Sequence, residues 1–217
     1  LEMEHKLKEL ISMIYDISYK LSPEIQVYKD NPSKKPVFTT TSNHVENHAH
    51  ETTITINLHT GTHIDFPLHM IEGGATSDSE DLNPLIGDCK VLDLTYVQEA
   101  ITVEDLKQFE IEKQDFLLFK TKNSFSETFL FDFTYLTEDA AIYLKDKQIR
   151  GVGTDGLGIE RAQSEHQTHK ILLSNNIIII EGLRLQDIEP KTYDLICLPL
   201  SIKGVEASLA RAILIEK

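Results

Sequence analysis

Three of the nine histidines in this chain stand close together, at positions 59, 63 and 69, in the segment H-T-G-T-H-I-D-F-P-L-H. Side chains two apart on an extended backbone point to the same side, so His63 and Asp65 can face one ion together. Gly61 lets the chain bend, which brings the imidazole of His59 toward that of His63. Neutral imidazole nitrogens and carboxylate oxygens are ordinary ligands of zinc and related divalent ions. The segment therefore predicts a metal site.

His69 differs from the other two histidines because it follows Pro67 closely. A proline cannot donate a hydrogen bond to a β-ladder, so we expect His69 on a loop beside the site rather than within a strand. The alternative for the whole segment is a run of polar loop histidines that bind nothing. The grouping of three imidazoles with a carboxylate argues against that alternative.

A second signal lies more than a hundred residues later, where four isoleucines at 177–180 are followed directly by Glu181 and Gly182. A carboxylate at the end of a buried strand is costly unless it is paired or bound to metal. Strand ends are also where α/β folds place their chemistry. His166 and His169 are three apart, so one face of a helix could present either of them. Glu181 is thus a candidate ligand, with a solvated strand-end carboxylate as the alternative.

The elements that must position these residues alternate between strand and helix. The alternating, β-branched residues 52–58 predict a strand that enters the histidine cluster. Thr137 is expected to cap a helix over 137–145, and Glu138 and Asp139 favour the positive end of its dipole. Further helices are expected at 7–14 and 166–174, and further strands at 14–18, 90–94, 115–121, 149–152, 177–180, 195–200 and 212–215. Such alternation indicates a single mixed α/β domain.

Composition excludes several classes of function. The chain has 217 residues with 21 Lys+Arg against 35 Asp+Glu, a formal charge of −14. That charge argues against nucleic acid and anionic membrane surfaces as partners. No apolar stretch is long enough to span a membrane, and no signal-peptide core is evident, so we expect a cytoplasmic location. The two cysteines, Cys89 and Cys197, are expected to be buried thiols rather than a disulfide framework.

The segment H-T-G-T-H-I-D-F-P-L-H resembles the signature of the cyclase-family metal-dependent hydrolases, the group that includes bacterial kynurenine formamidase and isatin hydrolase. Other stretches resemble the family in the same order: 14–23, 72–74 with Gly87, the G-x-D turn at 151–155, and the histidine-to-glutamate element at 169–183. The resemblance implies one α/β domain over residues 14–217, with mixed β-sheets and helices packed on one side, swivelling β/β/α-like. Residues 1–13 would be an N-terminal extension whose first residues need not be native.

The resemblance also implies a role for each site residue. His59, His63 and Asp65 would be metal ligands, and Asp65 could bridge two ions. His169 and Glu181 would complete a second metal position, and the family spacing favours His169 over His166. His69 would be the acid/base residue. Residues with supporting roles would be Asp155, as a structural or outer-sphere group, Tyr28, as a ring that stacks on substrate, and Phe66, as a side chain that narrows the pocket.

Four departures from the family pattern concern the substrate rather than the metal, and one of them is that residues 155–160 lack the family's usual serine. The chain has no tryptophan, whereas kynurenine formamidases of the family often stack tryptophan on the substrate ring, and only Tyr28 stands in the corresponding loop. Phe66 stands where small residues are common. Leu209 replaces the proline of a G-x-P-x-R-like stretch.

The function expected from the resemblance is metal-dependent hydrolysis of a C–N amide bond other than a peptide bond, such as N-formylkynurenine to kynurenine and formate in tryptophan catabolism. A divalent ion makes hydroxide available at neutral pH, and His69 would pass a proton to the leaving nitrogen. Zinc is the expected metal, as one or two ions, with manganese as the alternative. Two alternatives are hydrolysis of a cyclic amide or lactone at the same site, and metal binding without turnover.

The expected partners are a small-molecule substrate and further copies of the chain, as a homodimer or tetramer; neither nucleic acid nor membrane is expected. A second group of histidines, His44, His48 and His50, has no downstream carboxylate to support it. We expect it to lie on a solvated loop or strand edge.

Overall fold

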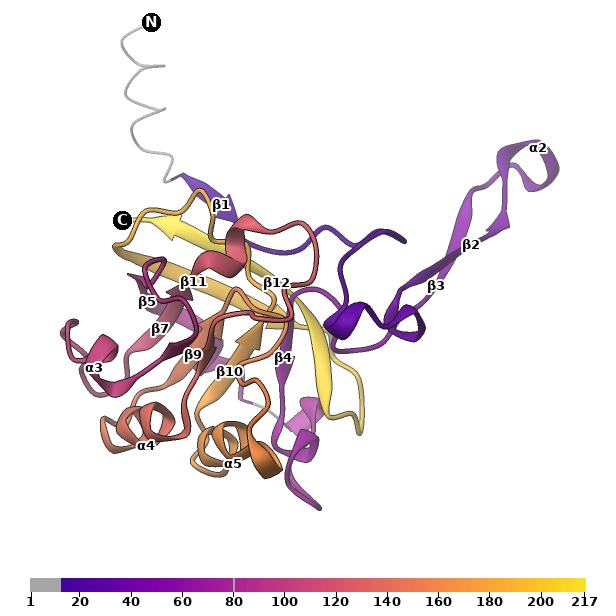
Figure 1. Cartoon of the computed structure of the whole chain (residues 1–217). Helices are drawn as coiled ribbons and strands as arrows, with labels where there is room; N and C mark the ends of the chain where they lie inside the picture. The colour runs from indigo at the N-terminus through magenta and orange to yellow at the C-terminus, as the bar shows by residue number, and fades with distance from the viewer. Residues whose placement is uncertain (1–12, 80) are drawn as a thin grey trace, which may run out of the picture.

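Eight strands among the described residues join one mixed β-sheet, which curls into a barrel (Figure 1). The structure is a computed structural model that describes residues 13–79 and 81–217. Within them the strand order is β1-β12-β11-β5-β7-β9-β10-β4, and β4 pairs with β12 as well. Strands β12 to β4 in that order thus form a closed barrel, to which β1 is added outside. The strands are β1 (Ile14–Asp16), β4 (His63–Asp65), β5 (Ile86–Asp93), β7 (Phe116–Lys120), β9 (Gly151–Thr154), β10 (Ile178–Glu181), β11 (Thr192–Pro199) and β12 (Ala207–Glu216).

Strands β5, β7, β9 and β10 run parallel to one another, whereas the other pairings in the barrel, including β11 with β5 and β10 with β4, are antiparallel. Parallel neighbours need a crossover connection, usually a helix. The three crossovers contain α3 (Val103–Leu106), α4 (Glu138–Asp146) and α5 (Gln167–Ser174). These helices lie in a row beside the parallel strands (Figure 1).

The parallel strands are apolar at successive positions because both of their faces are buried. On β7, Leu117 and Phe119 pack in the cluster that the helices share, whereas Phe116 and Leu118 pack in a separate cluster within the barrel. On β10, Ile179 belongs to the first cluster and its neighbours to the second. The strand period of two therefore divides one apolar run between two cores.

A hairpin extends away from the barrel and was not expected in this form (Figure 1). It comprises β2 (Val37–Ser42), the one-turn helix α2 (His44–Asn47) and β3 (Glu51–Thr55). The strand expected at 52–58 was predicted to enter the histidine cluster, but β3 ends at Thr55 and pairs with β2. Threonine and isoleucine favour an extended strand, but no residue of β3 is buried within the described chain. As predicted, the second histidine group is solvated, because His44, His48 and His50 are all exposed here.

The other predicted elements are largely confirmed, with ends shifted by a few residues. The Thr137 hydroxyl caps α4 by accepting from the backbone N–H of Ala140. Cys89 and Cys197 are buried free thiols, as predicted, and burial raises the pKa of each to about 12. No helix among the described residues is long and apolar enough to cross a membrane. The helix expected at 7–14 and most of the predicted N-terminal extension lie outside the described residues.

The fold-class prediction is confirmed as a single α/β domain with a mixed sheet. The packing of the helices on one side and the swivelling β/β/α-like arrangement stay predictions. The minor elements are the two-residue strands β6 (Ala100–Ile101) and β8 (Tyr135–Leu136), and short 3-10 turns at Tyr28–Asp30, Pro32–Lys34, Pro67–His69, Ser77–Ser79, Asn83–Leu85, Lys122–Phe125 and Ser164–His166.

Candidate metal centre

Strand β4 carries two of the predicted ligands and presents them on one face. His63 and Asp65 are both buried, and the intervening Ile64 packs with Phe66 in the core of the barrel. Strand β10 pairs with β4 in the register that sets Glu181 opposite His63. Glu181 Oε2 lies 3.5 Å from His63 Nε2. The sheet thus brings together a motif and a strand end that are more than a hundred residues apart in sequence.

Two further imidazoles complete the cluster around Asp65. His59 precedes β4, and its Nδ1 lies 3.1 Å from Asp65 Oδ1. His169, in the first turns of α5, places Nε2 at 3.6 Å from Asp65 Oδ2 and 3.3 Å from Glu181 Oε1. All five predicted ligands therefore converge, and Asp65 lies between His59 on one side and His169 on the other. This is the position that a bridging carboxylate would need.

The chain fixes the orientation of the His63 ring through a backbone carbonyl. His63 Nδ1 lies 2.9 Å from the carbonyl oxygen of Gly61. Because a carbonyl can only accept, Nδ1 carries a proton, and Nε2 is the nitrogen that faces Asp65 and Glu181. Gly61 can turn its carbonyl this way because it adopts a left-handed φ of 74°.

Glu160 supports His169 in a similar way and was not anticipated from the sequence. Its Oε1 lies 2.9 Å from His169 Nδ1, and its Oε2 accepts from the backbone N–H of Thr168 at 2.9 Å. His169 Nδ1 makes no aligned hydrogen bond among the described residues, but a carboxylate at this distance favours the proton on the nearer nitrogen and leaves the farther one to face a metal. His166 contacts the same Glu160 oxygen at 2.5 Å from an exposed position. The geometry therefore favours His169 over His166 as the residue that faces Asp65.

His69 lies beside the cluster but outside its network of ion pairs. It ends the 3-10 turn Pro67–His69, off the strand as expected. Its ring centroid is 4.2 Å from that of His59 and 5.6 Å from that of His169. Burial lowers the pKa of His69, so its imidazole is neutral at pH 7 and can accept a proton.

The cluster holds two ionised carboxylates away from water. Burial raises the pKa of Glu181, but His169 and His63 lower it to about 2 despite the neighbouring charge of Asp65. Burial also lowers the pKa of His63, but Asp65 and Glu181 raise it to about 10. Neither oxygen of Asp65 has a hydrogen-bond partner among the described residues, although imidazole nitrogens lie close to both. A buried carboxylate with both oxygens unpartnered, ringed by imidazoles, fits a divalent cation.

The centre opens into a pocket of about 260 Å³. His59, His69, His169 and Glu181 line it, and the other lining residues are Tyr28, Lys34, Met70, Leu157, Gly158, Glu160 and His166. The volume falls short of typical ligand pockets, so a small substrate suits it best.

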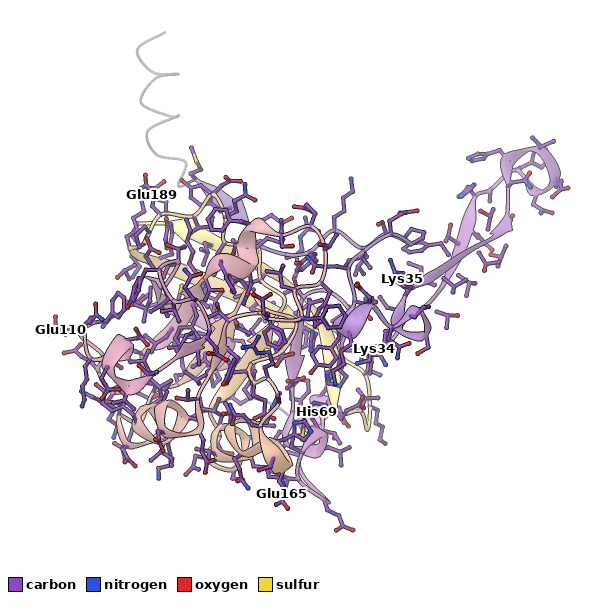
Figure 2. The ribbon with its side chains drawn as sticks, viewed as in Figure 1. Lys34, Lys35, His69, Glu110, Glu165 and Glu189 are labelled. Atoms are coloured by element: carbon purple, nitrogen blue, oxygen red, sulfur yellow. The ribbon has the colours of Figure 1, made fainter. Side chains whose placement is uncertain are left out.

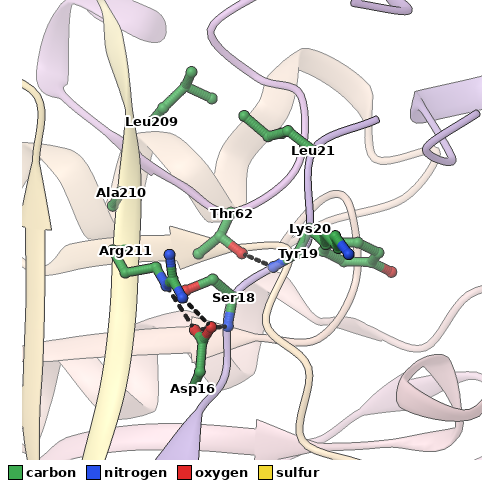
Figure 3. A pocket seen from close by; sticks show the side chains of 9 residues that line it. All are labelled: Asp16, Ser18, Tyr19, Lys20, Leu21, Thr62, Leu209, Ala210 and Arg211. Atoms are coloured by element: carbon green, nitrogen blue, oxygen red, sulfur yellow. Dashed lines mark hydrogen bonds and ion pairs between the residues drawn. The ribbon is translucent and has the colours of Figure 1, made fainter. Parts of the chain in front are cut away.

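A larger cavity of about 450 Å³ lies elsewhere, between β12 and the chain that follows β1 (Figure 3). Its main charged groups, Asp16 and Arg211, pair with each other at 2.5 Å. None of the predicted ligands lines it. We therefore take the smaller pocket as the candidate site.

The three predicted supporting residues, Tyr28, Asp155 and Phe66, lie in three different environments. Tyr28 lines the pocket, with Phe129 at 5.4 Å between ring centroids behind it. Asp155 is buried away from the cluster and accepts from the Thr121 backbone N–H and hydroxyl, both at 2.7 Å, so it anchors a turn. Phe66 is buried in the core rather than in the pocket lining.

Two carboxylates near the cluster could not be identified from the sequence. Glu160 follows an irregular loop, where no periodicity indicates the direction of a side chain. Glu206 approaches His59 Nε2 at 3.4 Å, from the residue before β12. Its position depends on the long-range pairing of β12 with β4.

Comparison with known proteins bears on this centre. The family model described as “Putative cyclase” matches residues 15–161, a span that includes the histidine motif. The chain belongs to the cyclase family. The resemblance stated from the motifs is thereby confirmed.

Relatives within the cyclase family extend the match over most of the chain. A kynurenine formamidase of Sphingopyxis alaskensis is 35% identical over 161 residues, 73% of this chain and 77% of that protein. A solved structure described as a potential metal-dependent hydrolase with cyclase activity is 49% identical, with a TM-score of 0.89 over 94% of this chain and 98% of that one. A solved structure of an isatin hydrolase bound to the product analogue thioisatinate shares the fold. Its sequence is 22% identical, and its TM-score is 0.83 over 99% of this chain and 96% of that one.

Proposed function

We propose that this cyclase-family protein is a metal-dependent hydrolase of a C–N amide bond, with an aryl formamide such as N-formylkynurenine as the leading substrate. The observation that carries the proposal is the buried Asp65 carboxylate, whose two unpartnered oxygens lie among the imidazoles of His59, His63 and His169. The relatives named kynurenine formamidase support the choice of a formamide.

His59, His63, Asp65, His169 and Glu181 would hold the metal, which we propose is zinc, as one or two ions. Nitrogen and oxygen donors without thiolate suit zinc, and manganese is the alternative because two carboxylates take part. When bound, the ion would lower the pKa of a coordinated water to about 7 and polarise the substrate carbonyl.

His69 would serve as the proton carrier. It lines the pocket, it is next to the ligands, and burial keeps its imidazole neutral by lowering its pKa. A neutral imidazole can accept a proton from the attacking water and deliver it to the leaving nitrogen. Tyr28 would support the aryl ring, since its own ring lines the pocket and is held from behind by Phe129 and Phe133.

The direct test is formate release from N-formylkynurenine by zinc-loaded and manganese-loaded protein, with opening of isatin measured in parallel. We expect formate release that a chelator abolishes and added metal restores. Opening of isatin alone would replace the formamide with a cyclic amide. Neither activity in metal-loaded protein would contradict the proposed substrates and favour metal binding without turnover.

We also propose that the chain forms a homodimer or a larger homo-oligomer through the β2–β3 hairpin. A two-stranded hairpin is marginally stable alone in water, and this one exposes Val37 by 58%, Phe38 by 37% and Ile54 by 47%. A second copy could cover these side chains. In sedimentation experiments we expect an oligomer that the double variant Phe38→Ser, Ile54→Ser dissociates, whereas a monomeric wild-type protein would contradict the proposal.

A further inference from the structure

One lysine stands in the lining of the metal pocket. Lys34 ends the 3-10 turn Pro32–Lys34, and it lines the same pocket as His59, His69 and His169. Figure 2 shows Lys34 and His69 on the same side of the molecule, near the base of the hairpin. A lysine here is unexpected because the site otherwise consists of imidazoles, carboxylates and apolar groups.

The backbone of Lys34 is fixed relative to the ligand strand. The buried Thr60 hydroxyl donates to the Lys34 carbonyl at 2.8 Å, and Thr60 is the residue directly after His59. The Lys34 backbone N–H donates to the Asn31 carbonyl at 3.0 Å, which closes the turn. The turn that carries Lys34 is therefore tied to the element that carries the first ligand.

The charge of Lys34 has no carboxylate partner within 4.0 Å among residues 13–79 and 81–217. Its ammonium lies instead 5.2 Å from the centre of the Tyr28 ring, and the ammonium of Lys29 lies 5.3 Å from that centre. The nearby carboxylates have other partners: Glu160 contacts His166 and His169, and Glu181 belongs to the ligand set. A cation thus remains at the pocket in a chain whose net charge is −14.

We propose that Lys34 determines specificity by pairing with a carboxylate on the aryl part of the substrate, so that the site prefers anionic aryl amides to neutral ones. This inference rests on the proposed function and deepens it. The substrate ring would lie against Tyr28 and Leu157, which line the same pocket. Its carboxylate would then reach the ammonium beside Tyr28, while the amide faces the ligands.

The kinetic test compares neutral formanilide with the three formamidobenzoate isomers, which differ from it by one carboxylate. The measured quantity is the ratio of kcat/KM for each isomer to that for formanilide. Lys34 is partly buried, and a hydrogen bond to a charged group is stronger than one between neutral groups. We therefore expect Lys34→Met to lower the best ratio roughly tenfold, or about 1.4 kcal/mol. Lys34→Arg should restore most of the ratio, because it restores the charge.

Lys35→Met is the matched control, since it removes the same charge one residue away. The Lys35 ammonium donates to the Glu24 carbonyl and does not line the pocket. The ratio of kcat/KM for the formamidobenzoates to that for formanilide should be the same in Lys35→Met as in the wild type. An equal fall for Lys34→Met and Lys35→Met would overturn the proposal, because it would show a general effect of charge. An unchanged ratio in Lys34→Met would overturn it as well.

A binding measurement separates this inference from the proposed hydrolysis. Calorimetry with benzenesulfonate, an anion that coordinates metal weakly, should show binding to the wild type and to Lys35→Met and a loss of roughly tenfold or more in Lys34→Met. If no formamide is hydrolysed, the proposed function fails, yet this titration still decides the role of Lys34. Absence of benzenesulfonate binding to the wild type, or equal binding to Lys34→Met, would refute that role.

Discussion

Glu160 is the carboxylate behind His169, and its replacement by glutamine tests whether it holds that imidazole ready for metal. Oε2 of Glu160 faces the backbone N–H groups of Thr168 at 2.9 Å and His169 at 3.4 Å. In Glu160→Gln the amide oxygen must take that place, since both groups donate. The amide NH₂ then replaces Oε1, which lies 2.9 Å from His169 Nδ1.

Two donors would thus face each other at His169, unless its proton moves to Nε2. That move would place a hydrogen between Nε2 and the carboxylates of Asp65 and Glu181, where the lone pair is needed. Loss of such a supporting partner typically lowers metal affinity roughly 10- to 100-fold, which is about 1.4 to 2.8 kcal/mol of binding free energy. Zinc affinity, measured by competition with a chromophoric chelator, should fall within that range.

Glu165→Gln provides the control for charge. Glu165 is exposed in the turn Ser164–His166 and has no ion pair among the described residues. Its substitution removes the same charge close to α5 and should leave zinc affinity at the wild-type value. If folded Glu160→Gln bound zinc as tightly as the wild type, His169 would not depend on Glu160, and our reasoning about the protonated nitrogen would be refuted.

Three further predictions concern the proton carrier, the backbone and pH. His69→Ala should retain zinc by elemental analysis but lose roughly 10²- to 10⁴-fold in kcat, so a wild-type rate would remove His69 from the mechanism. Gly182→Ala should lower the Tm more than Gly73→Ala. Both glycines have positive φ, but of the two only Gly182 would place a Cβ against backbone, 2.5 Å from the Gly61 carbonyl oxygen. The extra cost of this overlap should be roughly 1–3 kcal/mol, and equal Tm losses would contradict it. In chelator-treated protein, the stabilisation from protonated His63 is fully present below its unfolded pKa of about 6.5 and is lost as pH rises through the folded value of about 10. Urea unfolding should therefore show stability falling between pH 7 and 10, and falling less in His63→Gln; parallel pH profiles would disprove the assignment.

The histidine motif was predictable because its geometry is local. His63 and Asp65 share a face through the strand period alone, and Gly61 supplies the bend that orients His63. Glu181 was predictable for a different reason: burying a carboxylate directly after four isoleucines costs free energy unless it is paired or bound to metal. These two arguments required no knowledge of which strands pair.

What sequence reasoning missed depends on contacts between distant segments. The barrel closes where β12 pairs with β4, and nothing in the composition of either strand specifies that pairing. The same closure brings Glu206 to His59. Glu160 and Lys34 lie on irregular turns, where neither a period of two nor one of 3.6 predicts the direction of a side chain.

The hairpin shows the opposite error. Residues 52–58 have the alternation of a half-buried strand, yet β3 is exposed along its whole length. Alternation indicates a strand with one apolar and one polar face, but no part of the described chain covers either face of β3. A covering second copy would reconcile the pattern with the structure.

We propose above that a divalent ion binds between His59, His63, Asp65, His169 and Glu181. Anomalous diffraction at the zinc edge from crystals of the zinc-loaded protein tests it most directly. We predict a peak at about 2.0–2.2 Å from an oxygen of Asp65 and from the nearest imidazole nitrogens. A zinc peak at His44, His48 and His50 on the hairpin, with none at Asp65, would contradict the account.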